Sequence, residues 1–182
     1  MKKKILLHIC CGPCAIYPIE YLKNMDFEVT GLYYNPNIHP LMEYIKRRDA
    51  LLEVAKYYNI KIILKDKDYC LDDYFRKVVF RENNRCFYCY QMRIEKTVSI
   101  ANKGKFDYFT TTLLYSKFQK HNVIKSLCED LRMGKKVKFF YHDFREGWKY
   151  GIDKSKELNI YRQQYCGCIY SEFERFKKEL NN

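Results

Sequence analysis

The sequence predicts one α/β domain with a doubly wound, Rossmann-like and mainly parallel sheet. Short apolar runs alternate with segments in which apolar residues recur at helical spacing. This alternation is typical of parallel strands joined by crossover helices. No repeat, low-complexity stretch or linker interrupts the 182 residues, a length that suits one compact domain. We therefore expect a single α/β domain over residues 1–182.

The individual strands and helices are predicted from the period of the apolar pattern. Strands are expected at residues 4–9, 27–34, 60–64, 108–114 and 137–141. Helices are expected at residues 15–22, 41–58, 72–79, 86–101 and 123–131. A last helix is expected in the tail, where Ser171 followed by Glu174 has the spacing of a capping box. The alternation of strand and helix is regular in the first third of the chain and less clear after it.

The composition favours a polyanionic partner. The chain carries 34 Lys and Arg against 22 Asp and Glu, a formal net charge of +12. Neutralising phosphates releases condensed counterions, which drives nucleic acids onto such a surface. The 18 Tyr and 12 Phe include enough rings for base stacking beyond those that a core needs. A lysine-rich composition by itself also makes a protein basic, so the charge indicates nucleic acid without identifying it.

The cysteine content indicates metal binding or redox chemistry. No apolar run approaches the length that spans a bilayer. The basic start of the chain leads through a short apolar stretch into cysteines, so we expect no signal peptide and a cytoplasmic protein. Reducing compartments disfavour structural disulfides. Nine cysteines in such a chain therefore do not suggest a disulfide framework.

Seven of the cysteines fall into three groups. The groups are Cys10, Cys11 and Cys14, then Cys86 and Cys89, and then Cys166 and Cys168. The first group directly follows a predicted strand, and doubly wound sheets bind ligands at the carboxyl ends of their strands. The second group is a Cys-x-x-Cys on a predicted helix, where residues three apart are neighbours. Two such thiols are half of a four-thiolate site, which suits zinc or an iron–sulfur cluster equally by ligand count.

The number of thiols exceeds what one tetrahedral site needs, so we expect a cluster together with a reactive group. A disulfide between Cys166 and Cys168 would close a very small ring across Gly167. Such a ring is strained and easily reduced, as labile and catalytic disulfides are. Alternatively, these two thiolates hold a second metal ion, completed by Cys14 or by a carboxylate such as Asp143.

Motifs along nearly the whole chain resemble one known family. They are His8-Ile9-Cys10-Cys11-Gly12-Pro13-Cys14, Tyr34-Asn35-Pro36-Asn37-Ile38-His39-Pro40, Cys86-Phe87-Tyr88-Cys89-Tyr90 with Arg93, Thr111-Thr112-Leu113-Leu114, Asp143-Phe144-Arg145, and Tyr161-Arg162-Gln163 leading to Tyr165-Cys166-Gly167-Cys168. In this order and density they resemble the QueH family of epoxyqueuosine reductases.

The resemblance implies a fold, a reaction and a set of site residues. The implied fold is related to PP-loop and adenine-nucleotide hydrolase-like proteins. The implied reaction is the reduction of epoxyqueuosine to queuosine at the wobble position of tRNA, the last step of queuosine biosynthesis. The implied ligands of a [4Fe–4S] cluster are Cys10, Cys11, Cys86 and Cys89, and the implied redox-active pair is Cys166 and Cys168. The implied partners are tRNA carrying epoxyqueuosine and an electron donor that the sequence does not identify.

The chemistry leaves two arrangements open. Conversion of an epoxide to an alkene consumes two electrons and two protons, whereas a [4Fe–4S] cluster passes electrons singly. In one arrangement, an additional mononuclear iron acts as a Lewis acid on the epoxide oxygen, with Cys14, Cys166 and Cys168 as candidate ligands. His39 or Asp143 would then supply a proton. In the other, which we prefer, the cysteine pair is purely redox-active and the catalytic residues are Cys166, Cys168, Cys14 and Asp143.

Two other functions compete with the reductase. A PP-loop-like tRNA sulfur transferase needs a glycine- and serine-rich phosphate cradle after the first strand. The loop found there is Cys-Cys-Gly-Pro-Cys, and Pro13 removes an amide donor, which argues against that class. A zinc-stabilised tRNA-binding protein would be colourless and free of iron, so metal analysis separates it from a reductase.

Overall fold

Five parallel strands form the centre of the protein in the computed structural model, which describes residues 2–181. They are β1 (Lys3–His8), β2 (Phe27–Tyr33), β3 (Lys61–Leu64), β4 (Tyr108–Thr111) and β5 (Lys138–Phe139). The order β3-β2-β1-β4-β5 puts β1 in the middle of the sheet. From β1 the chain builds outward to β3 and then returns to add β4 on the other side. The predicted doubly wound α/β fold is therefore confirmed.

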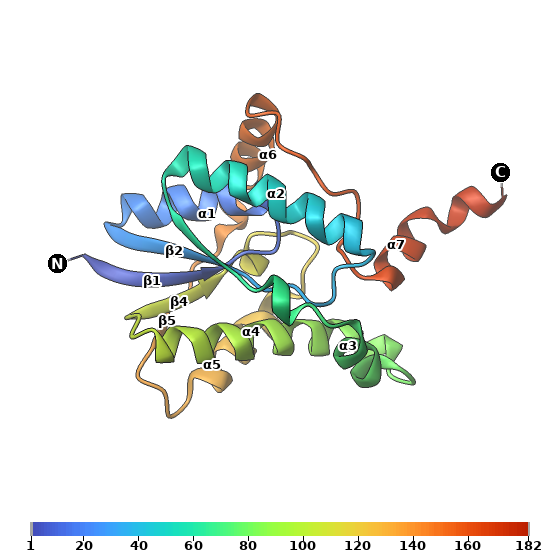
Figure 1. Cartoon of the computed structure of the whole chain (residues 1–182), viewed down its shortest axis with the longest axis horizontal. Helices are drawn as coiled ribbons and strands as arrows, with labels where there is room; N and C mark the ends of the chain where they lie inside the picture. Colours follow the sequence, from blue (N-terminus) through green and yellow to red (C-terminus); the bar gives the residue numbers. More distant parts are fainter. Residues whose placement is uncertain (1, 182) are drawn as a thin grey trace.

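Helices cover both faces of the sheet. The helices α1 (Gly12–Asn24) and α2 (Leu41–Tyr58) lie on one face, and α4 (Arg85–Lys103) and α5 (His121–Arg132) lie on the other (Figure 1). Because the sheet is enclosed, the middle of its central strand is wholly apolar, and Ile5, Leu6 and Leu7 are fully buried. The sequence predicted all four helices, although α1 begins earlier and α4 ends later than expected.

Three further helices complete the fold: α3 (Leu71–Val78), α6 (Trp148–Glu157) and α7 (Ile169–Phe176). The helix α6 packs against α1, and α7 projects from the body with the carboxyl terminus (Figure 1). The sequence did not predict α6, since Gly151 and Ser155 are its only buried residues and it has no apolar stripe. Among the described residues, no helix is both long enough and apolar enough to span a bilayer.

Two predicted boundaries were wrong for local reasons. The expected strand at residues 108–114 leaves the sheet after Thr111, where Thr111 Oγ1 accepts a hydrogen bond from the Leu113 amide at 3.1 Å and starts the 3₁₀ turn η3 (Thr112–Leu114). The tail helix is capped by Cys168 and not by Ser171. The Ser171 hydroxyl lies inside the first turn and donates to the Cys168 carbonyl at 2.7 Å. The remaining short turns are η1 (Asp66–Asp68), η2 (Glu82–Asn84), η4 (Phe144–Gly147) and η5 (Lys177–Asn181).

The sheet topology fixes where a site can form. The chain passes from β1 to β2 and β3 on one side of β1, and β4 and β5 lie on its other side. The carboxyl ends of β1 and β4 therefore meet at the topological switch point. The segments that follow them are the loop at Cys10 and the turn η3. Open α/β sheets bind their ligands in the crevice at such a point, because the diverging crossovers leave it uncovered.

Candidate metal centre

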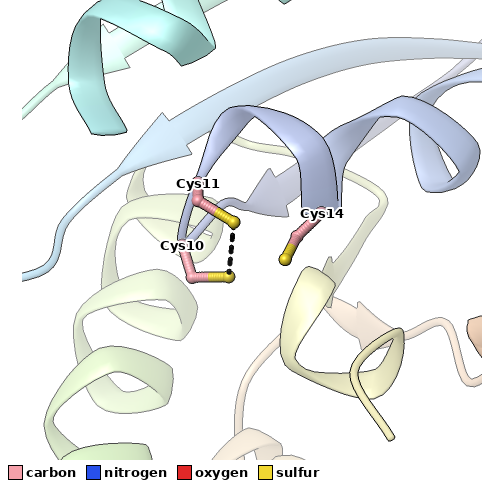
Figure 2. A group of neighbouring side chains, drawn as sticks. All are labelled: Cys10, Cys11 and Cys14. Atoms are coloured by element: carbon pink, nitrogen blue, oxygen red, sulfur yellow. Dashed lines mark hydrogen bonds between the residues drawn. The ribbon is translucent and has the colours of Figure 1, made fainter. Parts of the chain in front are cut away.

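The first three cysteines converge at the carboxyl end of β1. Cys10 and Cys11 lie in the loop, Cys14 lies in the first turn of α1, and their three side chains point toward one another (Figure 2). All three sulfurs lie within 4.8 Å of one another, and the Sγ atoms of Cys10 and Cys11 are 3.8 Å apart. Pro13 is the second residue of α1, and its fixed φ suits the first helical turn directly after the loop. The early helix start therefore brings Cys14 back over Cys10.

This buried trio favours one thiolate shared among three sulfurs. Hydrogen bonds from the Cys11 and Cys14 thiols stabilise a negative charge on Cys10 and hold the pKa of Cys10 well below its ordinary value. The Thr112 hydroxyl, whose oxygen lies 3.4 Å from Cys10 Sγ, adds to this effect. Burial raises the pKa of Cys11. Hydrogen bonding to Cys10 raises that of Cys14. The sulfurs thus form a compact donor set of the kind that soft metal ions prefer.

The other four thiols of the three groups come from the start of α4 and from the loop before α7. Cys86 and Cys89 lie at the start of α4, as the sequence predicted, and the charges of Cys166 and Cys168 act on both. Burial is the main cause that raises the pKa of Cys86, and it raises the pKa of Cys89 to about 12. Cys166 is exposed and Cys168 is half-buried. Thiols from two segments far apart in the chain therefore lie close enough to influence one another electrostatically.

Both groups border one cavity of about 800 Å³. The sulfur-bearing residues that line it are Cys10, Cys14, Cys89 and Cys166. The structure thus brings together residues that lie up to 156 positions apart in the chain, from Cys10 to Cys166. All nine cysteines are free thiols in this structure, so the disulfide between Cys166 and Cys168 stays a prediction.

Arg47 of α2 holds the loop that carries the last two cysteines. Its Nη1 donates to the Cys166 carbonyl at 2.8 Å and its Nη2 donates to the Tyr165 carbonyl at 2.9 Å. Its Nε donates to Glu43 at 2.7 Å, and this ion pair is almost fully buried, with the two side chains 1% and 7% exposed. The sequence did not single out Arg47, because nothing in the helical spacing of residues 41–58 indicates a partner so far along the chain.

Two glutamines that the sequence analysis gave no role donate to the sulfurs. Gln163 Nε2 lies 3.0 Å from Cys11 Sγ and 3.6 Å from Cys14 Sγ. Gln119 Nε2 lies 3.3 Å from Cys166 Sγ. These contacts help to orient the sulfurs of Cys11, Cys14 and Cys166. The position of Gln163 within a motif beside the last cysteines was the available signal.

Arg93 shows that the cavity wall needs negative charge. Its guanidinium is 4% exposed and donates to Asn37 Oδ1 at 3.0 and 2.8 Å. Among residues 2–181 it pairs with no carboxylate. Burial opposes its charge, yet the sulfurs of Cys89, Cys10 and Cys166 outweigh burial and raise its pKa. A buried cation without an anion is costly. Thiolates that carry a metal group would supply the missing charge.

A second orphaned group supports the same conclusion. The Asn37 Nδ2 amide is buried without a hydrogen-bond acceptor, and it acts on Cys89 to favour the thiolate. Buried donors left unsatisfied are rare. An anionic sulfur at this place would accept from it. The residues present therefore fit a thiolate-bound metal or iron–sulfur group.

Asp143 does not join the thiols. It lies outside the cavity lining, caps η4 and forms a two-point ion pair with Arg145, with contacts of 2.8 and 2.6 Å. This pairing lowers the pKa of Asp143 to about 2. A carboxyl group that stays ionised at neutral pH cannot donate a proton, so the placement does not favour the expected role.

Of the four histidines, His39 lies beside the loop that carries Cys166 and Cys168, and its amide donates to the Gly167 carbonyl. The Ile169 amide donates to His39 Nδ1 at 3.3 Å, which leaves the proton of the neutral ring on Nε2. Burial lowers the pKa of His39 to about 4. The ring is therefore neutral at pH 7, and it is a hydrogen-bond donor rather than a store of ionisable protons.

Comparison with known proteins identifies the family. The sequence profile of the family "Epoxyqueuosine reductase QueH" matches residues 5–174. The chain belongs to the QueH family. It is 37% identical to a protein named epoxyqueuosine reductase QueH from Dehalococcoides mccartyi, over 98% of this chain and 97% of that one. It is 36% identical to the protein of that name from Thermotoga maritima, over 96% of this chain and 93% of that one.

Solved structures with the same fold are much less similar in sequence. One is described as a predicted subunit of tRNA methyltransferase from Methanocaldococcus jannaschii, with a TM-score of 0.57, 14% identity and coverage of 99% of this chain and 89% of that one. Another is the U34-tRNA thiolase NcsA from Methanococcus maripaludis with its [4Fe–4S] cluster, with a TM-score of 0.53, 16% identity and coverage of 99% and 66%. These likenesses show that the chain shares its α/β fold with both solved structures.

Proposed function

We propose that this protein reduces epoxyqueuosine to queuosine at the wobble position of tRNA, the last step of queuosine biosynthesis. Membership of the QueH family supports the substrate. The net charge of +12 is suited to tRNA phosphates. The observation that carries the proposal is a single cavity lined by Cys10, Cys14, Cys89 and Cys166, from segments far apart in the chain, beside the uncompensated Arg93. A cytoplasmic location follows from the tRNA substrate.

The proposed cofactor is a [4Fe–4S] cluster with Cys10, Cys11, Cys86 and Cys89 as ligands. The sulfurs come from the loop after β1 and the first turn of α4, and Cys10 and Cys89 line the same cavity. A cluster is larger than a single ion and suits thiols contributed by two facing segments. Bound there, it supplies electrons one at a time. Arg93 and Asn37 stabilise the negative charge on its ligands.

The proposed redox pair balances the reaction. Reduction breaks both carbon–oxygen bonds of the epoxide, forms the carbon–carbon double bond and releases the oxygen as water, which requires two electrons and two protons. Oxidation of the Cys166 and Cys168 thiols to a disulfide releases two electrons and two protons. An external electron donor then returns the pair to the dithiol. The exposure of Cys166 at the cavity makes it the thiol that the substrate meets first.

The surrounding side chains have positioning roles in this proposal. Arg47 fixes the backbone carbonyls on either side of Cys166 and so aims its thiol into the cavity. Gln119 donates to the Cys166 sulfur and so helps to orient the thiol at the cavity. Gln163 orients Cys11 and Cys14 in the same way.

An adjacent mononuclear iron, with Cys14, Cys166 and Cys168 as candidate ligands, is the alternative to a purely redox-active pair. Cys14 and Cys166 line the same cavity, so both could reach such an ion. Anaerobic iron analysis separates the two arrangements. About four irons per chain support the redox pair alone, and about five support the added ion.

The decisive experiment combines metal analysis with turnover. Protein purified without air is assayed on tRNA carrying epoxyqueuosine, with loss of one oxygen from the nucleoside measured by mass. Cys86→Ser is expected to lose iron and activity together. Cys166→Ser is expected to keep its iron and lose turnover. Cys70→Ser, outside the cavity lining, is the matched control and is expected to keep both.

Three results would overturn all or part of the proposal. A Cys166→Ser protein with full activity would remove the redox pair. A colourless protein with stoichiometric zinc and no turnover would instead support a zinc-stabilised tRNA-binding protein. ATP-dependent sulfur transfer would support the PP-loop-like transferase, although the start of α1 offers thiols and Pro13 where that class needs amide donors.

A further inference from the structure

An aromatic pair forms part of the cavity lining, and one of its two rings is open to solvent. Phe118 and Trp148 both line the cavity, with ring centroids 5.7 Å apart and planes at 78°. The Phe118 side chain is 83% exposed, and nothing in residues 2–181 covers its outer face. A large ring left in water beside a cavity is a candidate binding surface rather than part of the core.

Neighbouring residues hold the two rings in place. The buried Tyr115 lies against Trp148 at 5.3 Å with planes 30° apart, and its hydroxyl donates to the Trp148 carbonyl at 3.1 Å. The Phe118 amide donates to Ser116 Oγ at 3.3 Å, which fixes the turn that presents the ring. A preorganised aromatic surface loses little entropy when a flat ligand stacks on it.

The charge around the pair is suited to a nucleic acid. Lys117 lies over the Trp148 ring at 6.0 Å. Arg162 and Arg175 are exposed and line the same cavity. The one carboxylate of the lining, Glu174, is engaged by Arg85. Exposed rings interleaved with cations are the means by which proteins bind single-stranded nucleotides.

We propose that Phe118, supported by Trp148, stacks on the nucleobase next to the wobble nucleotide when the wobble base occupies the cavity. This inference rests on the proposed function. The three cysteines at the end of β1 are buried, so a base that reacts at this cavity has to leave the stack of its loop. Its neighbour then loses a stacking partner, and the open face of Phe118 replaces it.

The test uses the only tryptophan of the chain, Trp148, as the reporter. The probe is an RNA hairpin with the anticodon loop of a queuosine-type tRNA and guanosine at the wobble position. Binding to the cluster-loaded protein is expected to change Trp148 fluorescence. Phe118→Ala is expected to weaken this binding about 5- to 150-fold, the range for loss of one base–aromatic stack. Phe80→Ala, which removes a ring that is 95% exposed and outside the cavity lining, is the control and is expected to bind like the wild type.

A second probe identifies the stacked base. A hairpin with an abasic site beside the wobble nucleotide is expected to lose the same affinity as Phe118→Ala, with no further loss when both changes are combined. Lys117→Gln is expected to make the salt dependence of binding shallower by about 0.7 in the log–log slope. Phe118→Ala is expected to leave that slope unchanged.

Failure of this inference and failure of the proposed function give different results. Equal hairpin affinity in Phe118→Ala and wild type overturns the stacking proposal, even if both proteins reduce epoxyqueuosine. A protein that binds the hairpin through Phe118 but reduces no epoxyqueuosine overturns the proposed function alone. If Phe118→Ala binds RNA normally but slows reduction by an added electron donor, the pair is a protein docking surface and the stacking proposal is wrong.

Discussion

Gly167 is the residue on which the geometry of the cysteine pair depends. Its φ of +142° lies in a region that side chains avoid, and a Cβ there would lie 3.0 Å from Arg47 Nη1 and 3.2 Å from Ile38 Cγ1. Its carbonyl accepts from the His39 amide at 2.7 Å. The residue between the two thiols is therefore bound to be small as well as flexible.

Gly167→Ala is expected to cost about 1–3 kcal/mol of stability and to abolish turnover, because the Cys166 thiol is displaced from the cavity. The control is Gly134→Ala, which also has a positive φ of +70° but has nothing within 4 Å of the added Cβ. We expect Gly134→Ala to lose some stability and no activity. Thermal unfolding and turnover on tRNA measure both, and an active Gly167→Ala protein would contradict the argument.

Asp143 tests a role that the sequence suggested and the structure does not favour. Arg145 lowers its pKa to about 2, below the ordinary 3.8, so its stabilising effect is fully present above 3.8 and is lost as pH falls through 2. Asp143→Asn is expected to reduce stability slightly at pH 7, with the difference from wild type vanishing near pH 2. The pH profile of turnover is expected to stay unchanged between 5 and 8. A shifted acid limb in that profile would restore Asp143 as the proton donor.

At the scale of elements, α2 packs on the sheet and holds the loop before α7 in place through Arg47. Glu43 and Arg47 lie one turn apart on α2, and Tyr161 donates to Glu43 Oε2 at 2.6 Å. The ion pair is buried, so each charge depends on the other and on the carbonyls that Arg47 binds. A helix on one face of the sheet thus positions thiols contributed from the end of the chain.

Arg47→Met is expected to destabilise the protein by about 3–5 kcal/mol, since it leaves the buried Glu43 carboxylate without a compensating positive charge. Combining it with Glu43→Gln is expected to recover much of the stability but not the activity, because the Cys166 carbonyl stays unbound. Arg48→Met, whose partners Asp49 and Asp66 are at the surface, is the control with an expected cost of about 0–1 kcal/mol. Denaturant unfolding measures the stability, and the alkylation rate of Cys166 measures the placement of its thiol. An inactive double variant with wild-type alkylation would show that Arg47 does not act by positioning Cys166.

The helices and strands show which local signals can be trusted. The helix at residues 41–58 was predicted to the residue, since its apolar positions repeat regularly along one face. The helix α6 was missed because it packs through Gly151 and Ser155 rather than through large apolar groups. Ser171 was expected to cap the tail helix, but a hydroxyl three residues before a glutamate is equally compatible with a place inside the first turn.

At the scale of the whole molecule, the metal group is expected to stabilise the fold. Its negative charge would compensate the buried Arg93 and accept a hydrogen bond from Asn37. Arg93 contributes buried positive charge beside the cavity, and Asn37 contributes an unsatisfied donor. Removal of iron by an anaerobic chelator is expected to lower the melting temperature by about 5–10 °C, the effect of losing a ligand present at about 100 times its dissociation constant. Hydrogen exchange is expected to rise at the start of α1 and of α4 but not at β5.

The control for iron removal is the Cys86→Ser protein. It lacks the group from the outset, so the chelator is expected to change neither its melting temperature nor its exchange. A chelated wild-type protein with an unaltered melting temperature would show that the thiol cavity is stable without metal. Arg93 would then need another anion.

The sequence by itself determined the α/β class, the family and the three cysteine groups, because each depends on spacing over a few residues. Tertiary structure alone decided that the three sulfurs of the first group lie buried within 4.8 Å of one another, and that Asp143 lies outside the cavity. It also decided that Arg47 reaches carbonyls 118 and 119 residues away. Local periodicity records which face of an element is buried, but not what packs against that face. That partner is set by the sheet order, which brings the carboxyl ends of β1 and β4 together at the cavity.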